Sequence, residues 1–311
     1  MNIRKEDRVK TLARSFLRKV NSYKAISRAA LAMKNKGMLP PFIWRRLPYE
    51  GVFDVVLPDG KHFKYHSVPE DGIGRLLYWG GVELYECETV KAFYALAKDS
   101  IFTIDIGANT GLYTLIACSA RDDSKVVSIE PEANSHELLM RNIALNGWLD
   151  RCRAIKAAAS DHSGQEILYN VTGSVTVTAT LSPQEGAMSL CAETKVNVIT
   201  VDEIVEELGG IDLAKIDVEG YEDTVLRGMD RSMSKYKPAL IIECIPESPV
   251  RGIERILSEK GYLFFHLTDK GASAKNEMVP DPNKIFRNYL CLHRERAGRI
   301  DQMESRMRDW R

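Results

Sequence analysis

The stretch from Thr103 to Thr114 constrains the fold more than any other part of the chain. Its sequence, TIDIGANTGLYT, joins a short β-branched apolar run to a helical run that begins at Leu112. Such an apolar run predicts a buried parallel strand. Gly107 and Gly111 let the connecting turn bend tightly and let a ligand approach the backbone. The pattern predicts a strand–turn–helix unit of an open α/β sheet, with a ligand site at the turn.

The chemistry of this turn narrows the class of ligand. The spacing is Gly-x-x-x-Gly, which differs from the Gly-x-Gly-x-x-Gly of dinucleotide binders, and no Lys-Ser/Thr follows as in a phosphate loop. We find no nicotinamide-side catalytic pair, so a nucleotide-dependent oxidoreductase is disfavoured. The apolar run ends at a carboxylate, Asp105, which suits a ligand with a cationic or amine-bearing head. S-adenosylmethionine is such a ligand.

Two further strand ends carry carboxylates. The run 125–130 predicts a second strand that ends at Glu130, about twenty residues beyond the glycines, where a carboxylate can accept both ribose hydroxyls. A helix is expected over 133–146, and a third strand over 153–157 leads to a polar turn in which Asp161 can reach an adenine amine. In the alternative interpretation neither residue binds a ligand: Glu130 is a solvated residue at the end of a strand, and Asp161 helps to form a turn.

A later segment gathers more carboxylates. Asp217 and Glu219 follow a mostly apolar strand at 211–216, and Glu243 ends the next apolar strand. The carboxyl ends of such strands meet at one edge of a sheet, where ligands bind. The carboxylates then act as a general base for a substrate hydroxyl, or as oxygen ligands for Mg²⁺. In the purely structural alternative, Glu219 caps the following helix and Asp217 pairs with Lys215.

Together these motifs resemble the FkbM family of S-adenosylmethionine-dependent methyltransferases. The likeness covers roughly residues 70 to 293, and its narrowest motif is the octet KIDVEGYE. The matching segments are WGGVE (79–83), DIGANTG (105–111), Glu130-Pro131, 142–147, Ala159-Ser160-Asp161 and KIDVEGYE (215–222).

The resemblance implies a fold, a reaction and a set of site residues. The fold is α/β: a doubly wound, mostly parallel seven-stranded sheet of the class I, Rossmann-like methyltransferases, with an N-terminal helical and β-hairpin extension. The implied cofactor-binding residues are Asp105, Gly107, Asn109, Gly111, Glu130 and Asp161. The implied catalytic residues are Lys215, Asp217 and Glu219. By analogy with catechol-type enzymes, Asp217, Glu219 and Glu243 are candidate Mg²⁺ ligands.

The expected activity is O-methylation of a hydroxyl on a saccharide or natural-product acceptor of the polyketide or glycolipid type. The alternatives are an N-methyltransferase of a small molecule and a non-catalytic S-adenosylmethionine-binding adaptor. An Asn/Asp-Pro-Pro-Tyr loop, which marks many N-methylating enzymes, is missing from the fourth strand end. The motif carboxylates are all retained, which argues against the adaptor.

Charge is distributed unevenly along the chain. Residues 1–36 carry eleven Lys and Arg and two acidic residues, whereas the whole chain has a formal net charge of zero. Apolar residues recur in this segment at helical spacing, which predicts a basic amphipathic helix. Such a helix contacts an anionic membrane surface, or packs on the domain or on a second subunit in a homodimer. We expect no nucleic-acid partner, because the remaining chain is acidic.

Composition fits a globular protein of 311 residues that is 44% hydrophobic. Six scattered cysteines without a Cys-x-x-Cys pair, and a start without an apolar signal core, favour a cytoplasmic protein, with peripheral contact at the inner membrane face as an extension. The expected division is a basic helix and Pro-rich linker (1–48), a hairpin and helices over the site (49–98), the methyltransferase domain (99–293) and a charged tail (294–311).

Two smaller expectations concern the regions around the cofactor domain. Val52 to Tyr65 alternates around Asp59-Gly60, a hairpin signal. The aromatic residues Tyr78, Trp79 and Tyr85 either line an acceptor pocket or pack in the core. A strand-rich insertion is expected between 165 and 201, with alternation at 175–181.

Overall fold

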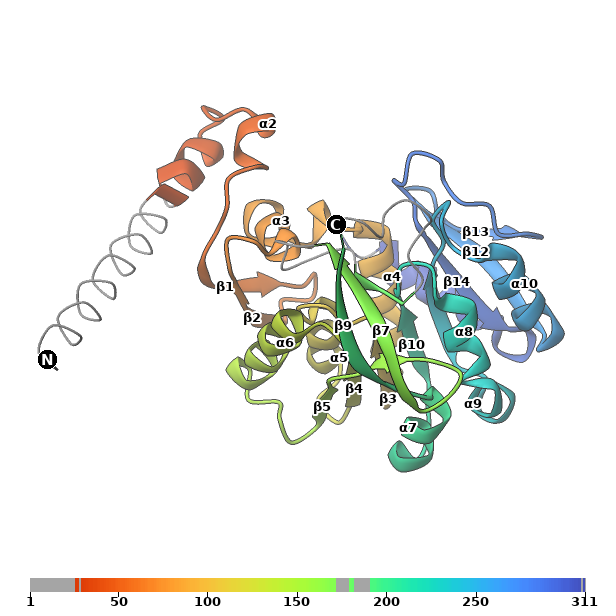
Figure 1. Ribbon diagram of the computed structural model, residues 1–311. Helices are drawn as coiled ribbons and strands as arrows, with labels where there is room; N and C mark the ends of the chain where they lie inside the picture. The colour runs from red at the N-terminus through yellow and green to blue at the C-terminus, as the bar shows by residue number, and fades with distance from the viewer. Residues whose placement is uncertain (1–25, 28, 172–178, 182–190, 309, 311) are drawn as a thin grey trace, which may run out of the picture.

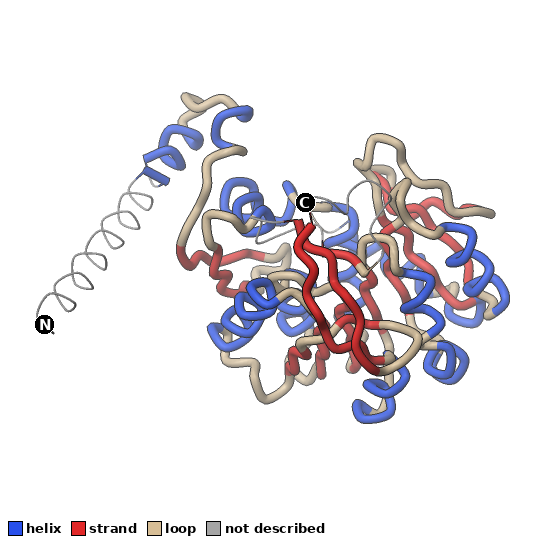
Figure 2. Tube along the Cα trace, viewed as in Figure 1, coloured by secondary structure: helices blue, strands red, loops and turns tan. Residues whose placement is uncertain are grey.

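The computed structural model describes residues 26–27, 29–171, 179–181, 191–308 and 310. Its centre is one eight-stranded sheet, flanked by helices on both faces (Figures 1 and 2). In spatial order its strands are β13 (Gly271–Lys275), β12 (Tyr262–Thr268), β14 (Asn288–His293), β11 (Ala239–Glu243), β10 (Leu213–Ile216), β3 (Phe102–Ile106), β4 (Lys125–Ile129) and β5 (Cys152–Ile155).

The strand directions confirm the expected doubly wound architecture. The strands β11, β10, β3, β4 and β5 are parallel neighbours, and the chain order reverses between β3 and β10. Strand β14 runs antiparallel between β11 and β12. The seven expected strands are therefore present, and the short antiparallel strand β13 adds an eighth at the edge. The reversal creates the crevice in which open α/β sheets bind ligands.

Alternation along the strands divides the interior into two cores. One core contains α3 (Gly72–Gly80), α4 (Cys87–Ala97), α5 (Leu112–Ala120), α6 (Ala133–Leu145) and α11 (Arg299–Arg308). The other contains α7 (Val201–Leu208), α8 (Glu222–Arg227), α9 (Asp230–Tyr236) and α10 (Val250–Glu259). In β10, Leu213 belongs to the first core, and Ala214 and Ile216 belong to the second. This period of two decides which polar strand residues share a face.

The charged C-terminal segment is packed rather than free. It forms the 3₁₀ turn η3 (Arg294–Arg296) and the helix α11, which buries Met303 and Met307, and Trp310 beyond the helix is buried as well. The Trp310 ring lies edge-on against Tyr94 of α4, with ring centroids 5.4 Å apart. None of the helices in the described ranges combines the length and apolar content needed to cross a bilayer.

The N-terminal part contains the predicted hairpin. Strands β1 (Gly51–Val56) and β2 (His62–Ser67) are antiparallel and are joined around Asp59-Gly60. They precede α3 and the 3₁₀ turn η1 (Gly81–Leu84). The Pro-rich segment predicted as a plain linker contains a one-turn helix, α2 (Pro41–Trp44), because Pro41 occupies a first-turn position that needs no N–H donor. Most of the predicted basic helix at 1–36 lies outside the described residues; residues 29–35 are helical.

Polar side chains fix the hairpin to the glycine turn after β3. Asn142 of α6 accepts from the His66 N–H at 2.7 Å and donates to the Thr110 carbonyl at 2.9 Å. Asn146 pairs with both the N–H and the carbonyl of Lys64. The buried Tyr65 hydroxyl lies 2.5 Å from the Thr110 hydroxyl. The hairpin is thus bound to the same turn that the sequence assigns to the cofactor.

A second, smaller sheet crosses the front of the domain in Figure 1. It consists of β6 (Ala158–Ala159), β9 (Cys191–Ile199), β7 (Gly164–Val171) and β8 (Ala179–Thr180). This is the strand-rich insertion expected after Gln165. The expected alternation at 175–181 lies largely outside the described residues.

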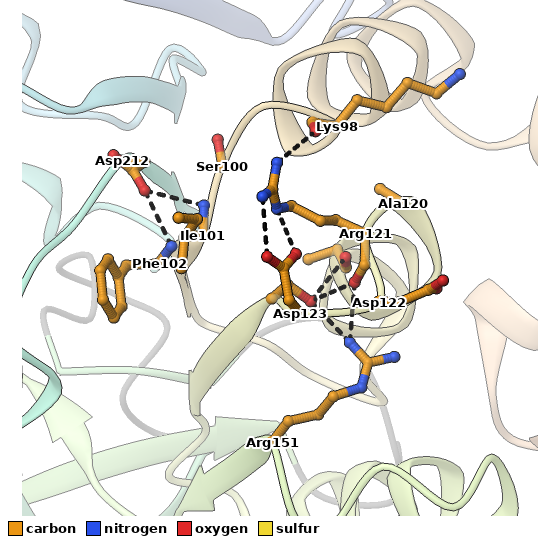
Figure 3. A network of polar contacts seen from close by, with 12 residues as sticks. Lys98, Ser100, Ile101, Phe102, Ala120, Arg121, Asp122, Asp123, Arg151 and Asp212 are labelled. Atoms are coloured by element: carbon orange, nitrogen blue, oxygen red, sulfur yellow. Dashed lines mark hydrogen bonds and ion pairs between the residues drawn. The ribbon is translucent and has the colours of Figure 1, made fainter.

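The amino-terminal edge of the main sheet carries a purely structural network (Figure 3). Asp212 accepts from the N–H groups of Ile101 and Phe102 at 2.9 and 3.0 Å, which joins the starts of β10 and β3. Arg151 donates to the Arg121 carbonyl at 3.1 Å and closes the start of β4. These groups lie at the sheet edge opposite the one where ligands bind.

We predict that Asn142→Leu destabilises the protein. Leucine is of similar size but leaves the buried His66 N–H and Thr110 carbonyl unpaired, at about 1–3 kcal/mol each. Urea unfolding should show a loss of about 3 kcal/mol in the free energy of unfolding. The control is Asn134→Leu on the exposed side of the same helix, expected within about 0.5 kcal/mol of wild type. Equal effects of the two substitutions would contradict the assigned contacts.

Candidate functional site

The turn after β3 is built on a buried carboxylate. Asp105 is 1% exposed and accepts from the N–H and the hydroxyl of Thr114 at 2.9 and 2.7 Å. These bonds attach the first turn of α5 to the strand end. Burial raises the pKa of Asp105 to about 6, although its bonds with Thr114 and the charge of Lys215 oppose the shift. Asp105 lies within β3 rather than after it, and it positions the turn through its hydrogen bonds with Thr114.

The two glycines are required for packing. Both have positive φ, 76° at Gly107 and 98° at Gly111. A Cβ on Gly107 would lie 1.8 Å from the Asp217 carbonyl oxygen, and one on Gly111 would lie 2.7 Å from Leu139. The turn after β3 and the turn after β10 are therefore in backbone contact.

Glu130, which is buried, and Asn109, which is partly buried, lie together at this turn. The Glu130 carboxylate accepts from the N–H groups of Asn109 and Glu132 at 2.8 and 2.9 Å, and burial raises its pKa to about 7. Asn109 has a left-handed backbone with φ of 49°. Its buried Oδ1 atom has no hydrogen-bond partner in the described part of the chain. An unpaired buried acceptor beside a glycine turn fits a ligand with donor groups, such as the ammonium of S-adenosylmethionine.

Asp161 is in a different situation. It follows β6, is exposed, and lies 3.0 Å from His162 Nδ1 and 3.1 Å from Arg227 Nε. The hydrogen bond with His162 and the pairing with Arg227 lower its pKa. The predicted contact with adenine stays a prediction, and Asp161 would have to exchange these partners to make it.

A layer of polar side chains lies at the carboxyl ends of the central strands. Lys215 of β10 is paired in register with Asp105 of β3, and Glu243 of β11 with Asn288 of β14. By the period of two, these four side chains point toward the face that α4 and α5 cover. The strands thus bring together residues that are far apart in sequence.

Lys215 and Asp217 form the central pair of this layer. The Lys215 side chain is fully buried, and its Nζ atom lies 2.9 Å from Asp217 Oδ2. Burial raises the pKa of Asp217, but the charge and hydrogen bond of Lys215 outweigh burial, and the net pKa is lowered. Asp217 therefore stays ionised and is a weak proton acceptor.

Arg287 holds two further carboxylates. Its guanidinium bridges Glu86 and Glu243, the latter at 3.0 Å. Glu86 also accepts from the Tyr113 hydroxyl at 2.8 Å and from the Asn288 amide at 3.1 Å. Burial and the charge of Asp217 raise the pKa of Glu243 to about 10, so Glu243 holds a proton at neutral pH while Asp217 stays ionised.

Among Asp217, Glu219 and Glu243, Glu219 is the carboxylate whose pKa lies nearest to neutral pH. Its backbone is left-handed, with φ of 52°, which turns it away from the line of β10. Burial and the charge of Asp217 raise its pKa to about 7, while Arg287 and Lys284 oppose the shift. The sequence placed Glu219 beside Asp217, and the structure keeps it at this edge.

The carboxylates fit a divalent cation poorly. Among the described residues, the carboxylates whose oxygens lie within 4.8 Å of one another are Glu86, Asp217 and Glu243, which differs from the predicted set containing Glu219. Arg287 already binds Glu86 and Glu243, and Lys215 binds Asp217. Two fixed cations therefore supply the positive charge that Mg²⁺ would bring, and a metal would have to displace them.

Sequence reasoning missed Glu86, Arg287 and Asn288. Glu86 lies between η1 and α4 with φ of 41°, and Arg287 lies 201 residues away just before β14. The one usable signal was an arginine immediately before a strand with six buried residues.

The structure also decides between the two predicted roles of Trp79, an acceptor pocket or the core. Trp79 is fully buried against Trp44 and packs in the core.

Comparison with known proteins gives a consistent result. A model of the methyltransferase FkbM domain matches residues 105–264. Methyltransferase sdnD of Sordaria araneosa is 28% identical over 197 residues, which cover 52% of this chain and 73% of that protein. Methyltransferase 1 of Beauveria bassiana is 25% identical over 194 residues, with 57% and 76% covered.

Solved structures match part of the chain at low sequence identity. The methyltransferase FkbM of Methylobacillus flagellatus KT is 18% identical with a TM-score of 0.43, and the match covers 63% of this chain and 44% of that one, less than half its length. A putative O-methyltransferase of Klebsiella pneumoniae is 14% identical with a TM-score of 0.38, with 66% and 80% covered.

We predict that Glu130→Gln weakens binding of S-adenosylhomocysteine at least about tenfold, because an amide cannot accept from two N–H groups and two ribose hydroxyls as a carboxylate can. Isothermal titration measures the affinity. The control is Glu137→Gln on the exposed side of α6, which should bind as wild type does. Unchanged affinity of a folded Glu130→Gln variant would remove Glu130 from the cofactor site.

Proposed function

Because this chain belongs to the FkbM family of S-adenosylmethionine-dependent methyltransferases, we propose that it methylates a hydroxyl oxygen of a saccharide or natural-product acceptor. The observation that carries the proposal is the backbone contact between Gly107 and Asp217. It joins the cofactor turn directly to the carboxylate edge. A methyl donor bound at the cofactor turn and an acceptor bound at the carboxylate edge would then be neighbours, which is the main requirement of methyl transfer.

S-adenosylmethionine supplies a methyl group that its sulfonium already activates. The tasks left to the protein are to bind it, to orient the acceptor and to remove one proton. In the proposed arrangement Glu130 accepts from the ribose hydroxyls, and Asn109 Oδ1 accepts from the ammonium. Asp105 keeps the turn in place through Thr114.

Glu219 is the proposed general base. A base works best when its pKa lies near the working pH, and the pKa of Glu219 is about 7. Asp217 has a lowered pKa and is held by Lys215. It therefore contributes fixed negative charge beside the acceptor and holds the pKa of Glu219 up.

A base with a near-neutral pKa suits oxygen as the acceptor atom. A hydroxyl is neutral at the outset, and the base needs to act only as the methyl group transfers. Glu219, with a pKa of about 7, fits this task and supports O-methylation rather than N-methylation.

One groove suits the remote part of a large acceptor. It has a volume of about 710 Å³ and lies between the loop 276–287 and strands β12 and β14. His266 stacks on Tyr289 in its wall, with ring centroids 4.6 Å apart, and Phe286 completes it. Tyr289 belongs to the core on the α7–α10 side of the sheet, so the groove opens on the face opposite to that of Asn288 and the carboxylate cluster, beside the same strand ends. Aromatic faces mixed with amide and charged groups suit a polyhydroxylated acceptor better than a purely apolar one.

The test is transfer of a labelled methyl group from S-adenosylmethionine to a panel of polyhydroxylated saccharides and glycosides. We expect methyl ethers, identified by nuclear magnetic resonance, and we expect equal turnover in buffer with EDTA, because Lys215 and Arg287 replace a metal. Amine-containing analogues serve as the comparison. Methylation confined to nitrogen would refute the proposal, and turnover that only Mg²⁺ restores would refute the metal-free mechanism.

We further predict that Glu219→Gln lowers kcat by about 10²-fold or more, in the range for loss of a general base. S-adenosylhomocysteine affinity should stay at the wild-type value. The base acts only when deprotonated, so wild-type kcat should rise with pH through about 7, and the variant should lose this rise. The control is Glu247→Gln, an ion-paired residue on the same sheet edge. A variant with the wild-type pH profile would exclude Glu219 as the base.

A further inference from the structure

The segment before the hairpin exposes an unusual amount of apolar surface. The described residues contain fourteen exposed large hydrophobic side chains, and five of them lie between residues 26 and 43. Three gather on and just before α2, with exposed fractions of 61% for Met38, 66% for Phe42 and 37% for Ile43. We call these three residues the apolar wedge.

The wedge is firmly attached to the domain through its other side. Trp44 of α2 is buried against the fully buried Trp79 of α3, with ring centroids 6.4 Å apart. Trp79 Nε1 donates to the Leu47 carbonyl at 2.8 Å, and Lys34 Nζ donates to the Trp79 carbonyl. Trp79 thus anchors this segment to the domain.

Positive charge without a matching carboxylate surrounds the wedge. Lys36, Arg45 and Arg46 are exposed, and no carboxylate of the described residues pairs with them. The sequence contains no acidic residue from Ile26 to Tyr49. Figure 1 shows the segment carrying α2 projecting from the body of the molecule, away from the central sheet.

From this we propose that the apolar wedge and its basic rim dock the protein on an anionic membrane surface. Phe42, Ile43 and Met38 would enter the headgroup and acyl boundary, and the three cations would bind lipid phosphates. The segment that carries the wedge projects from the body (Figure 1), so these side chains can reach a lipid surface while the rest of the domain stays outside it. The body of the chain is acidic overall and would be repelled by such a surface, so contact would be confined to this segment.

The test is co-sedimentation of the full-length protein with phosphatidylcholine vesicles, with and without phosphatidylglycerol. Wild type should bind only the vesicles that contain phosphatidylglycerol. Phe42→Ala with Ile43→Ala should weaken this binding at least about tenfold through lost apolar burial. Lys36→Glu with Arg45→Glu should weaken it by about fivefold or more per residue through lost attraction to the lipids.

The control is Leu149→Ala, which removes a side chain 56% exposed on the body and should bind as wild type does. S-adenosylhomocysteine titration of every variant reports that the domain is folded, and it does not depend on the membrane. Failure of wild type to bind either vesicle overturns the proposal. So does wild-type binding by the Phe42 and Ile43 variant. A dimer in sedimentation velocity that this variant dissolves, without vesicle binding, would instead show an interface between two copies.

Discussion

The burial of Lys215 is the constraint on which the site depends. An ammonium group in the interior is stable only with negative partners close by, and Asp217 provides the nearest at 2.9 Å. Glu86 adds a further carboxylate, which Arg287 binds, and Glu243 beside them has a pKa of about 10 and holds a proton. The cluster is therefore neutralised by its own cations. Removing Lys215 or Arg287 would leave a buried carboxylate without its partner, which would lower the free energy of unfolding by about 3–5 kcal/mol.

This arrangement gives two neighbouring carboxylates different protonation behaviour. Asp217 is paired with Lys215 and stays charged, whereas Glu219 lies in the field of Asp217 and holds its proton up to about pH 7. The surroundings of each carboxylate, rather than the residue type, decide that Asp217 stays charged and that Glu219 can exchange a proton near neutral pH. The left-handed backbone at Glu219 is part of this division, because it moves the side chain off the line of the strand.

The strand ends were predictable, and the contacts between distant segments were not. Buried parallel strands are short apolar runs that end at polar residues, so Asp105, Glu130 and Glu243 could be assigned to one sheet edge from the sequence. Gly107 was predicted for ligand approach, but its missing Cβ makes room for the backbone at Asp217. Glu86 and Arg287 meet only because β14 inserts beside β11, and no local pattern encodes that meeting.

The two amides of α6 have a consequence for the behaviour of the hairpin in solution. A two-stranded sheet leaves a row of unpaired backbone groups along each edge, and such edges recruit strands from other chains. Asn142 and Asn146 bind the N–H and carbonyl groups of His66 and Lys64, which are the groups a third strand would use. The helix thus caps one edge of the hairpin with side chains, and intermolecular strand addition is blocked on that side without any further strand.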